Sequence, residues 1–154
     1  MLIRTATPDD SGEICALIRG LIGPILTTPD GRGADAFLRS ISEASIHACI
    51  ESPDYLYLVA VSGTQVFGAM ALRSNRHIHH LFVSPDYQRR GIATQLWSTA
   101  KRHATRQGHV GRFTVNASIG AIPVYERLLF VADGAPVVGA GISYQPMSLE
   151  EPVV

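Results

Sequence analysis

The sequence is poor in cysteine and has no excess of charge of either sign. Only two of its 154 residues are cysteine, Cys15 and Cys49, and 13 basic residues balance 13 acidic ones. Both cysteines stand among apolar residues in predicted helices, without metal-ligand spacing around them. We therefore expect free, buried thiols rather than a disulfide or a metal site. A net charge of zero provides no electrostatic basis for binding nucleic acid or an anionic membrane.

Long hydrophobic runs and nucleotide-binding motifs are also missing. No apolar run reaches the length of a membrane span, and residues 2–6 are typical of a strand rather than a signal peptide, so we expect a cytoplasmic protein. The chain contains neither Gly-Lys-Ser/Thr nor Gly-x-Gly-x-x-Gly, which argues against a P-loop or Rossmann domain. Without repeats or linkers, and with 46% apolar residues, residues 1–154 are predicted to form one domain with a substantial core.

The order of predicted elements indicates an α/β protein. Thr7-Pro8-Asp9-Asp10 follows a strand over 2–6 and begins a helix that runs to about residue 20. Further helices are expected at 34–50, 91–107 and 118–128, and strands at 55–61, 65–72, 77–83 and 112–116, with two more strands at the end of the chain. The loop from Gly23 to Gly33 is long for a connection. Because long ordered loops are often functional, we expect it to form a wall of a substrate pocket.

A predicted anion site lies near the middle of the chain. The strand pattern that starts at residue 77 stops at Ser84-Pro85, and Gln-x-x-Gly-x-Ala over residues 88–93 then opens an amphipathic helix. Free N–H groups at a helix start attract a phosphate or pyrophosphate, and the helix dipole adds to this attraction. Small residues at 91 and 93 allow a ligand to approach the main chain, and two arginines at 89 and 90 supply charge. Taken alone, the pattern is also typical of an ordinary turn that caps a helix.

Two later blocks extend this motif into a family pattern. Residues 116–118 are Asn-Ala-Ser and residues 124–130 are Val-Tyr-Glu-Arg-Leu-Leu-Phe, one strand-and-helix unit further on. With them the chain resembles the GNAT superfamily of acyl-CoA-dependent N-acetyltransferases. The pyrophosphate loop of that family is Gln/Arg-x-x-Gly-x-Gly/Ala, and its later segment is Asn-Ala-Ser…Val-Tyr-Glu-Arg-x-Gly-Phe. Residues 141–147 are similar to the last strand of many small members. Leu129 stands where the family has Gly, a departure that concerns the turn after the helix rather than the cofactor site.

The resemblance implies a GNAT fold, in which a mixed, mostly antiparallel sheet has helices on both faces and two parallel strands splay apart. The pantetheine arm of acetyl-CoA, the implied co-substrate, pairs with backbone groups in that cleft like an added strand, and no metal is implied. The cofactor contacts carried over to this chain fall on Leu81, Phe82, Val83, Gln88, Arg89, Arg90, Gly91, Ile92, Ala93 and Asn116. Residues 81–83 are equally typical of a core strand, and both interpretations can hold because the implied contacts use backbone atoms.

Transfer to an amine requires a base. An alkylamine has a pKa near 10, so removing its proton at pH 7 costs roughly 4–5 kcal/mol without help. His77 and His79 occupy the register in which arylalkylamine acetyltransferases carry paired catalytic histidines, and histidine titrates closest to the working pH. Other branches of the family use Glu or a water chain, and the alternative role for each histidine is a hydrogen-bonded core or surface residue. Strand alternation predicts His77 and His79 on one face and His80 on the other.

The leaving group also needs a partner. Family members use a Tyr at the position of Tyr125 to protonate or hydrogen-bond the departing sulfur, while the alternative is a Tyr that only packs its ring. The expected activity is thus acetyl transfer from acetyl-CoA to a primary amine of a small molecule or peptide, by direct attack in a ternary complex. The competing hypothesis is a sensor that binds acyl-CoA without transferring it. No nucleic-acid or membrane partner is expected, and homodimers are common among the relatives.

Overall fold

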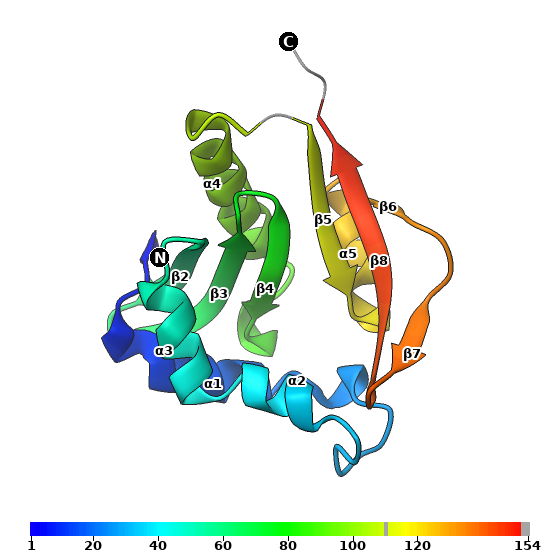
Figure 1. The fold of residues 1–154 in the computed structure, drawn as a ribbon. Helices are drawn as coiled ribbons and strands as arrows, with labels where there is room; N and C mark the ends of the chain where they lie inside the picture. Colours follow the sequence, from blue (N-terminus) through cyan, green and yellow to red (C-terminus); the bar gives the residue numbers. More distant parts are fainter. Residues whose placement is uncertain (110, 152–154) are drawn as a thin grey trace.

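The computed structural model describes residues 1–109 and 111–151, and its framework is a single sheet (Figure 1). The strands are β1 (Leu2–Thr5), β2 (Tyr55–Ser62), β3 (Gln65–Arg73), β4 (His77–Val83), β5 (Arg112–Ala117), β6 (Val131–Ala132), β7 (Val137–Gly139) and β8 (Ile142–Glu150). Their order is β1-β2-β3-β4-β5-β8-β6, with β7 paired to β8. All pairs are antiparallel except β4 with β5. The predicted α/β class with a mixed, mostly antiparallel sheet is confirmed.

Helices cover both faces of this sheet. They are α1 (Ser11–Arg19), α2 (Asp35–Ser40), α3 (Glu43–Glu51), α4 (Ile92–Arg106) and α5 (Ile122–Arg127), with short 3₁₀ turns at Pro8–Asp10, Gly23–Ile25, Pro85–Tyr87 and Ile119–Ala121. One buried cluster joins α4 and α5 to the sheet, and a second joins α1 and α3 to its other face. Cys15 and Cys49 are both free thiols, in α1 and α3 respectively, and only Cys49 is fully buried. Within the described ranges, no helix combines the length and the apolar character that a membrane crossing requires.

The helix predicted over 34–50 is in fact two helices, because Ser42 starts a new one. Its backbone is extended, and its hydroxyl accepts a hydrogen bond from the Ser45 N–H at 3.1 Å, which is an N-cap. Ile41, just before it, is completely buried and anchors the break. At the other end of the chain the structure has three strands, β6, β7 and β8, where two were predicted.

Leu129, which stands where the family pattern has Gly, leaves the turn after α5 intact. Leu129 adopts the left-handed conformation normally taken by glycine, with φ +74°, and its side chain is 74% exposed. The Phe130 N–H still donates to the Tyr125 carbonyl oxygen at 2.9 Å, so the chain leaves the helix in a closed turn. The turn therefore keeps the left-handed conformation that suits glycine, although this conformation is strained for a leucine.

A bulge in β4 opens the sheet at its centre. The β3–β4 pairing changes register between Ala71, opposite His80, and Leu72, opposite Ile78, which leaves His79 as an extra residue. Such a bulge bends its strand and increases the local twist. The pairing of β4 with β5 accordingly ends at Ile78, opposite Val115, and the two parallel strands diverge beyond it (Figure 1).

The loop between α1 and α2 is attached across this gap to the far half of the sheet. The Thr27 N–H donates to the Gly141 carbonyl oxygen at 2.9 Å, and Leu26 pairs with Ile142 as an isolated bridge. A Cβ at Gly141 would lie 2.5 Å from the Ala34 nitrogen, so the close approach of the two segments requires glycine there. This contact holds the loop over the open end of the sheet.

Candidate active site

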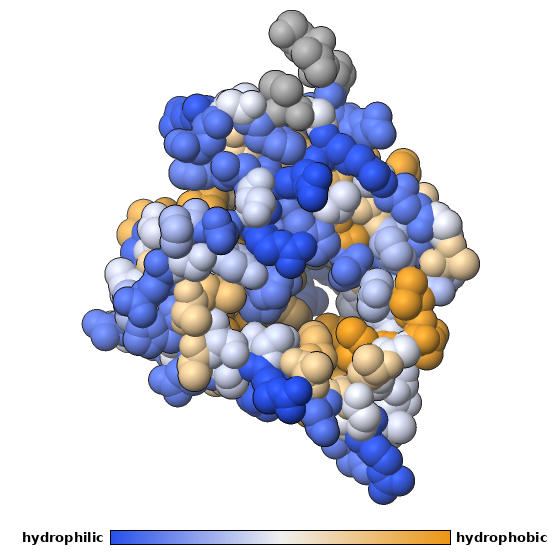
Figure 2. Space-filling model, in the orientation of Figure 1, coloured by the Kyte–Doolittle hydropathy of each residue, from blue (hydrophilic) through white to orange (hydrophobic). Residues whose placement is uncertain are grey.

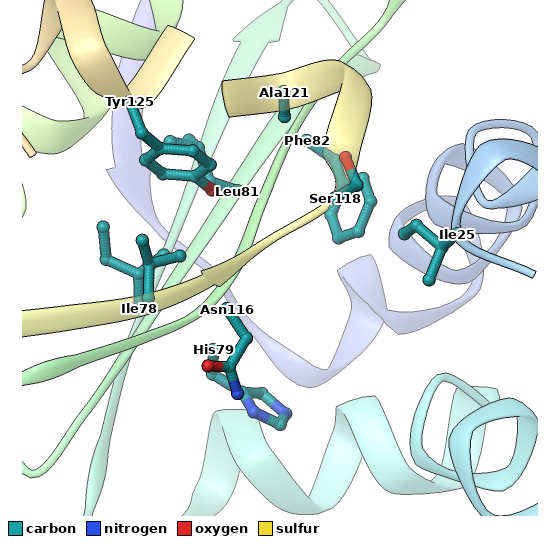
Figure 3. Close-up of a pocket in the computed structure, with 10 residues that line it drawn as sticks. Ile25, Ile78, His79, Leu81, Phe82, Asn116, Ser118, Ala121 and Tyr125 are labelled. Carbon is teal, nitrogen blue, oxygen red and sulfur yellow. The ribbon is translucent and has the colours of Figure 1, made fainter. Parts of the chain in front are cut away.

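The gap between β4 and β5 contains a cavity of about 60 Å³ (Figures 2 and 3). Its lining residues are Ile25, Ile78, His79, Leu81, Phe82, Val115, Asn116, Ser118, Ala121 and Tyr125. Figure 2 shows the hollow between the two halves of the sheet, with apolar side chains along its lower rim and hydrophilic ones above it. Ile25 comes from the loop predicted to form a pocket wall, so this part of the loop does reach the cavity.

Backbone groups of β4 face this cavity. The Ser84 N–H donates to the Phe67 carbonyl oxygen at 2.8 Å, and hydrogen-bonded pairs alternate along an antiparallel ladder. The N–H and C=O of Phe82 therefore point to β3, whereas those of Leu81 and Val83 point toward the gap. The Val83 carbonyl accepts from the Gln88 side chain at 2.9 Å. The N–H and C=O of Leu81 and the N–H of Val83 thus point into the gap, where an extended ligand could pair with them. Phe82 instead faces the cavity with its ring.

The segment before α4 presents its N–H groups as an anion site. Arg89 and Gly91 both adopt left-handed conformations, with φ +63° and +76°. Within the described chain, the N–H groups of residues 89–91 donate to no backbone carbonyl, and the first turn of a helix has none to donate to. The 15-residue helix α4 adds its dipole behind them. A Cβ at Gly91 would meet nothing within 4 Å, so space exists beside the main chain for a phosphate-sized group.

Neighbouring side chains stabilise this segment. Gln88 is held by its bond to Val83, and Tyr87 stacks on Phe67 with ring centroids 4.1 Å apart. The Arg90 guanidinium lies 5.3 Å from the Tyr87 ring centroid, a cation–π contact that keeps its charge beside the segment. The segment predicted to bind a pyrophosphate is thus held in place and combines N–H groups that donate to no backbone carbonyl with a nearby positive charge, a donor set that fits such a group.

Tyr125 reaches the cavity from α5. Figure 3 shows its ring entering beside Leu81, with the hydroxyl directed into the cavity. Burial raises the pKa of the phenol above its ordinary value, so it remains protonated at neutral pH. Within the described residues its hydroxyl forms no hydrogen bond and is not a buried unpaired atom, so its proton is available to a group that enters the cavity.

The histidines are arranged differently from the alternation predicted for a regular strand. Because His79 is the bulge residue, His79 and His80 lie on the same face, with ring centroids 4.2 Å apart. The prediction that His80 faces the opposite side is therefore wrong. His80 is only 5% exposed, and its Nδ1 lies 2.8 Å from the hydroxyl of Tyr57, a partner that nothing in the local sequence indicated.

Only one of the three histidines lines the cavity. His77 lies beside it, with Nδ1 2.7 Å from the Thr114 hydroxyl, and burial together with Arg73 and Arg76 lowers its pKa to about 4. Burial lowers the pKa of His80 to about 3. His79 forms part of the cavity wall, and burial, helped by Arg73, lowers its pKa below the ordinary 6.5. All three imidazoles are neutral at pH 7, and His79 is the one placed on the cavity wall.

The wall opposite β4 is formed by β5 and the turn after it. Asn116 and Ser118 line the cavity there, as do Val115 and Ala121. Asn116 is a sequence-predicted site residue, and Figure 3 shows its side chain on the same side of the strands as His79. Ser118 and the ring of Phe82 were not singled out from the sequence, because which side chains enter a gap between strands depends on the divergence of those strands.

Comparison with known proteins matches this geometry. A family described as the acetyltransferase (GNAT) domain matches residues 25–151. The chain belongs to the GNAT acetyltransferase family. No protein of curated function matches its sequence. The fold and the cleft between β4 and β5 are therefore to be interpreted as those of a GNAT acetyltransferase.

Solved structures share this GNAT fold over nearly the whole chain. A GCN5-related N-acetyltransferase from Rhodopseudomonas palustris is 23% identical with a TM-score of 0.77, covering 97% of this chain and 95% of its own. The PaiA N-acetyltransferase of Thermoplasma acidophilum, solved in complex with coenzyme A, is 16% identical with a TM-score of 0.77, covering 97% and 98%. The aminoglycoside 6′-N-acetyltransferase of Enterococcus faecium is 13% identical with a TM-score of 0.71, covering 100% and 99%. At these identities the likeness establishes the fold.

Proposed function

We propose that this GNAT protein transfers an acetyl group from acetyl-CoA to a primary amine of a small molecule or peptide, by direct attack in a ternary complex. The observation that carries the proposal is the placement of Tyr125 and His79 on the walls of one cavity, at the point where β4 leaves β5. One is a protonated phenol and the other a neutral imidazole. Acyl transfer to an amine needs one proton acceptor and one proton donor, and the two side chains supply them.

The cofactor side of the proposed site consists mainly of backbone. The N–H groups of residues 89–91 and the first turn of α4 bind the pyrophosphate, and Arg89 and Arg90 add charge. Leu81 and Val83 pair with the pantetheine arm, which orients the thioester toward Tyr125. Asn116 contacts the cofactor from β5. When bound, acetyl-CoA supplies an activated acyl group whose carbonyl carbon accepts the nucleophile.

His79 takes up the proton of the attacking amine. The bond between the amine nitrogen and the carbonyl carbon forms, and a backbone N–H of β4 near Leu81 stabilises the developing oxyanion. The carbon–sulfur bond then breaks, and the Tyr125 hydroxyl donates its proton to the leaving thiolate. Solvent exchange returns the proton from His79 to Tyr125, so that atoms and charge balance over one turnover. His77, bonded to Thr114, positions the strand beside His79.

The test is a kinetic comparison of two tyrosine variants. Tyr125→Phe removes one hydroxyl and little volume, so we expect kcat to fall about tenfold or more, while the Kd of acetyl-CoA from calorimetry stays unchanged. Tyr144→Phe is the matched control, because Tyr144 does not line the cavity. Release of free coenzyme A thiol reports turnover across a panel of amines. Wild-type turnover in Tyr125→Phe would contradict the assigned role.

A non-catalytic acyl-CoA sensor of the same fold is the alternative. It predicts tight binding of acetyl-CoA with neither transfer to any amine nor hydrolysis, and mass spectrometry of the purified protein would then find bound coenzyme A. The hydroxyl of Tyr125 inside the cavity favours catalysis, because there it can donate a proton to a leaving thiolate.

A further inference from the structure

The cationic side chain of Arg73 lies on the same face of the sheet as His79, the face on which we propose that the acceptor amine binds. Arg73 ends β3 and lies opposite Tyr55 of β2 on one side and opposite His77 of β4 on the other. Its neighbour Leu72 is fully buried in the cluster under α4, so alternation directs Arg73 to the other face. The ring of His79 lies edge-on to Tyr55, with centroids 5.2 Å apart. Arg73, His77 and His79 therefore share one face of the sheet, and His79 among them lines the cavity.

Two arginines near His77 and His79 lack an acidic partner within the described residues. Arg73 and Arg76 are exposed, and neither forms an ion pair with any residue in the described ranges. The cavity lining, within the same ranges, contains no Asp or Glu. Besides burial, the charge of Arg73 lowers the pKa of both His77 and His79, and Arg76 also lowers that of His77. Asp54 lies beside this end of β3, where its carbonyl oxygen accepts from the Ser74 N–H at 2.7 Å, but its carboxylate forms no ion pair with Arg73 within the described residues.

This electrostatic pattern bears on the amine that the site accepts. An ammonium group is repelled by uncompensated arginines, and a polyamine or aminoglycoside is repelled several times over. A monoamine that also carries an anion gains an attraction that offsets this repulsion. The same cations favour the neutral, nucleophilic form of the bound amine.

We infer that the acceptor is an amine bearing a carboxylate, with the carboxylate bound by the Arg73 guanidinium and the amine directed to His79. This inference rests on the proposed function and names its substrate class. A guanidinium matches a carboxylate in a two-bond fork geometry. Ile25 and the ring of Phe82 line the acceptor side and suit an apolar body between the two charged ends.

The test compares amines in matched pairs that differ only by a carboxylate in place of hydrogen: propylamine with 4-aminobutyrate, benzylamine with 4-(aminomethyl)benzoate, and phenethylamine with phenylalanine. We expect kcat/KM to be about tenfold or more higher for the carboxylated member of at least one pair. Arg73→Gln should raise the KM of that substrate about tenfold with little change in kcat, and should not raise the KM of the member without a carboxylate. Arg73→Lys should restore part of the preference, because it keeps the charge without the fork.

Controls and outcomes separate this inference from the proposed function. Arg106→Gln removes an exposed arginine at the far end of α4 and should leave every substrate unaffected. The carboxylate preference should shrink as salt is raised from low to high concentration. Equal or better turnover of the amines without a carboxylate, or of spermidine, would overturn the inference and leave the proposed function standing. Absence of transfer to every amine, with acetyl-CoA bound, would overturn both.

Discussion

The buried histidine on β4 makes the stability of the protein sensitive to acid. His80 is 5% exposed and bonded to Tyr57, and burial lowers its pKa from 6.5 to about 3. Below pH 6.5 the unfolded chain binds a proton that the folded protein does not, so the stability present above pH 6.5 is lost as the pH falls toward 3. At 1.36 kcal/mol per pH unit, the 1.5 units between pH 6.5 and pH 5 correspond to a loss of about 2 kcal/mol.

The double variant Tyr57→Phe/His80→Leu isolates this contribution, because it removes both polar partners and leaves no unpaired group in the core. We expect urea unfolding of the wild type to lose about 2 kcal/mol more than the variant when the pH is lowered from 7 to 5. His77, whose pKa is also lowered, is present in both proteins, so its effect cancels in the difference. An equal loss in both proteins, at equal m-values, would show that His80 is protonated in the fold and would refute the reasoning.

Three further predictions concern the cofactor loop, the base and the turn after α5. Gly91→Val should weaken acetyl-CoA binding about tenfold or more in calorimetry. Gly63→Val is the control, because Gly63 also has a positive φ (+59°) and free space around it, and it should leave the affinity unchanged. Unchanged affinity in a folded Gly91→Val protein would contradict the assignment of the loop. The kcat/KM profile should rise with pH through an apparent pKa below 6.5 and then flatten until the amine titrates. His79→Gln should lose this rise of kcat/KM at acidic pH, and His77→Gln should keep it. If the rise survives in His79→Gln, the amine is deprotonated by water. Leu129→Gly should raise stability by about 1 kcal/mol, because it relieves a left-handed φ at an exposed site, and a lower Tm would show that the leucine side chain stabilises the turn.

Elements and motifs that depend on neighbours in the chain were predictable. The strand that ends at Ser84-Pro85, the glycine turn at 91 and the amphipathic helix α4 all follow from local propensity and periodicity. The block around Tyr125 placed a phenol on a helix, and the structure brings that helix to the cleft. These signals were sufficient for the family and for the fold, because each is encoded within a dozen or so adjacent residues.

Only the tertiary structure decided what the three histidines do. Whether a strand carries a bulge depends on its pairing with β3, and His79 is left over only because Ala71 lies opposite His80 and Leu72 opposite Ile78. That single extra residue turns His80 to the face of His79 and coincides with the separation of β4 from β5. The bond of His80 to Tyr57 and the placement of Arg73 beside His79 likewise join residues on different strands. The sequence by itself therefore determined most of the elements and the loop before α4 that we propose binds the cofactor, whereas strand register, which no single segment encodes, determined which side chains lie on the proposed acceptor side.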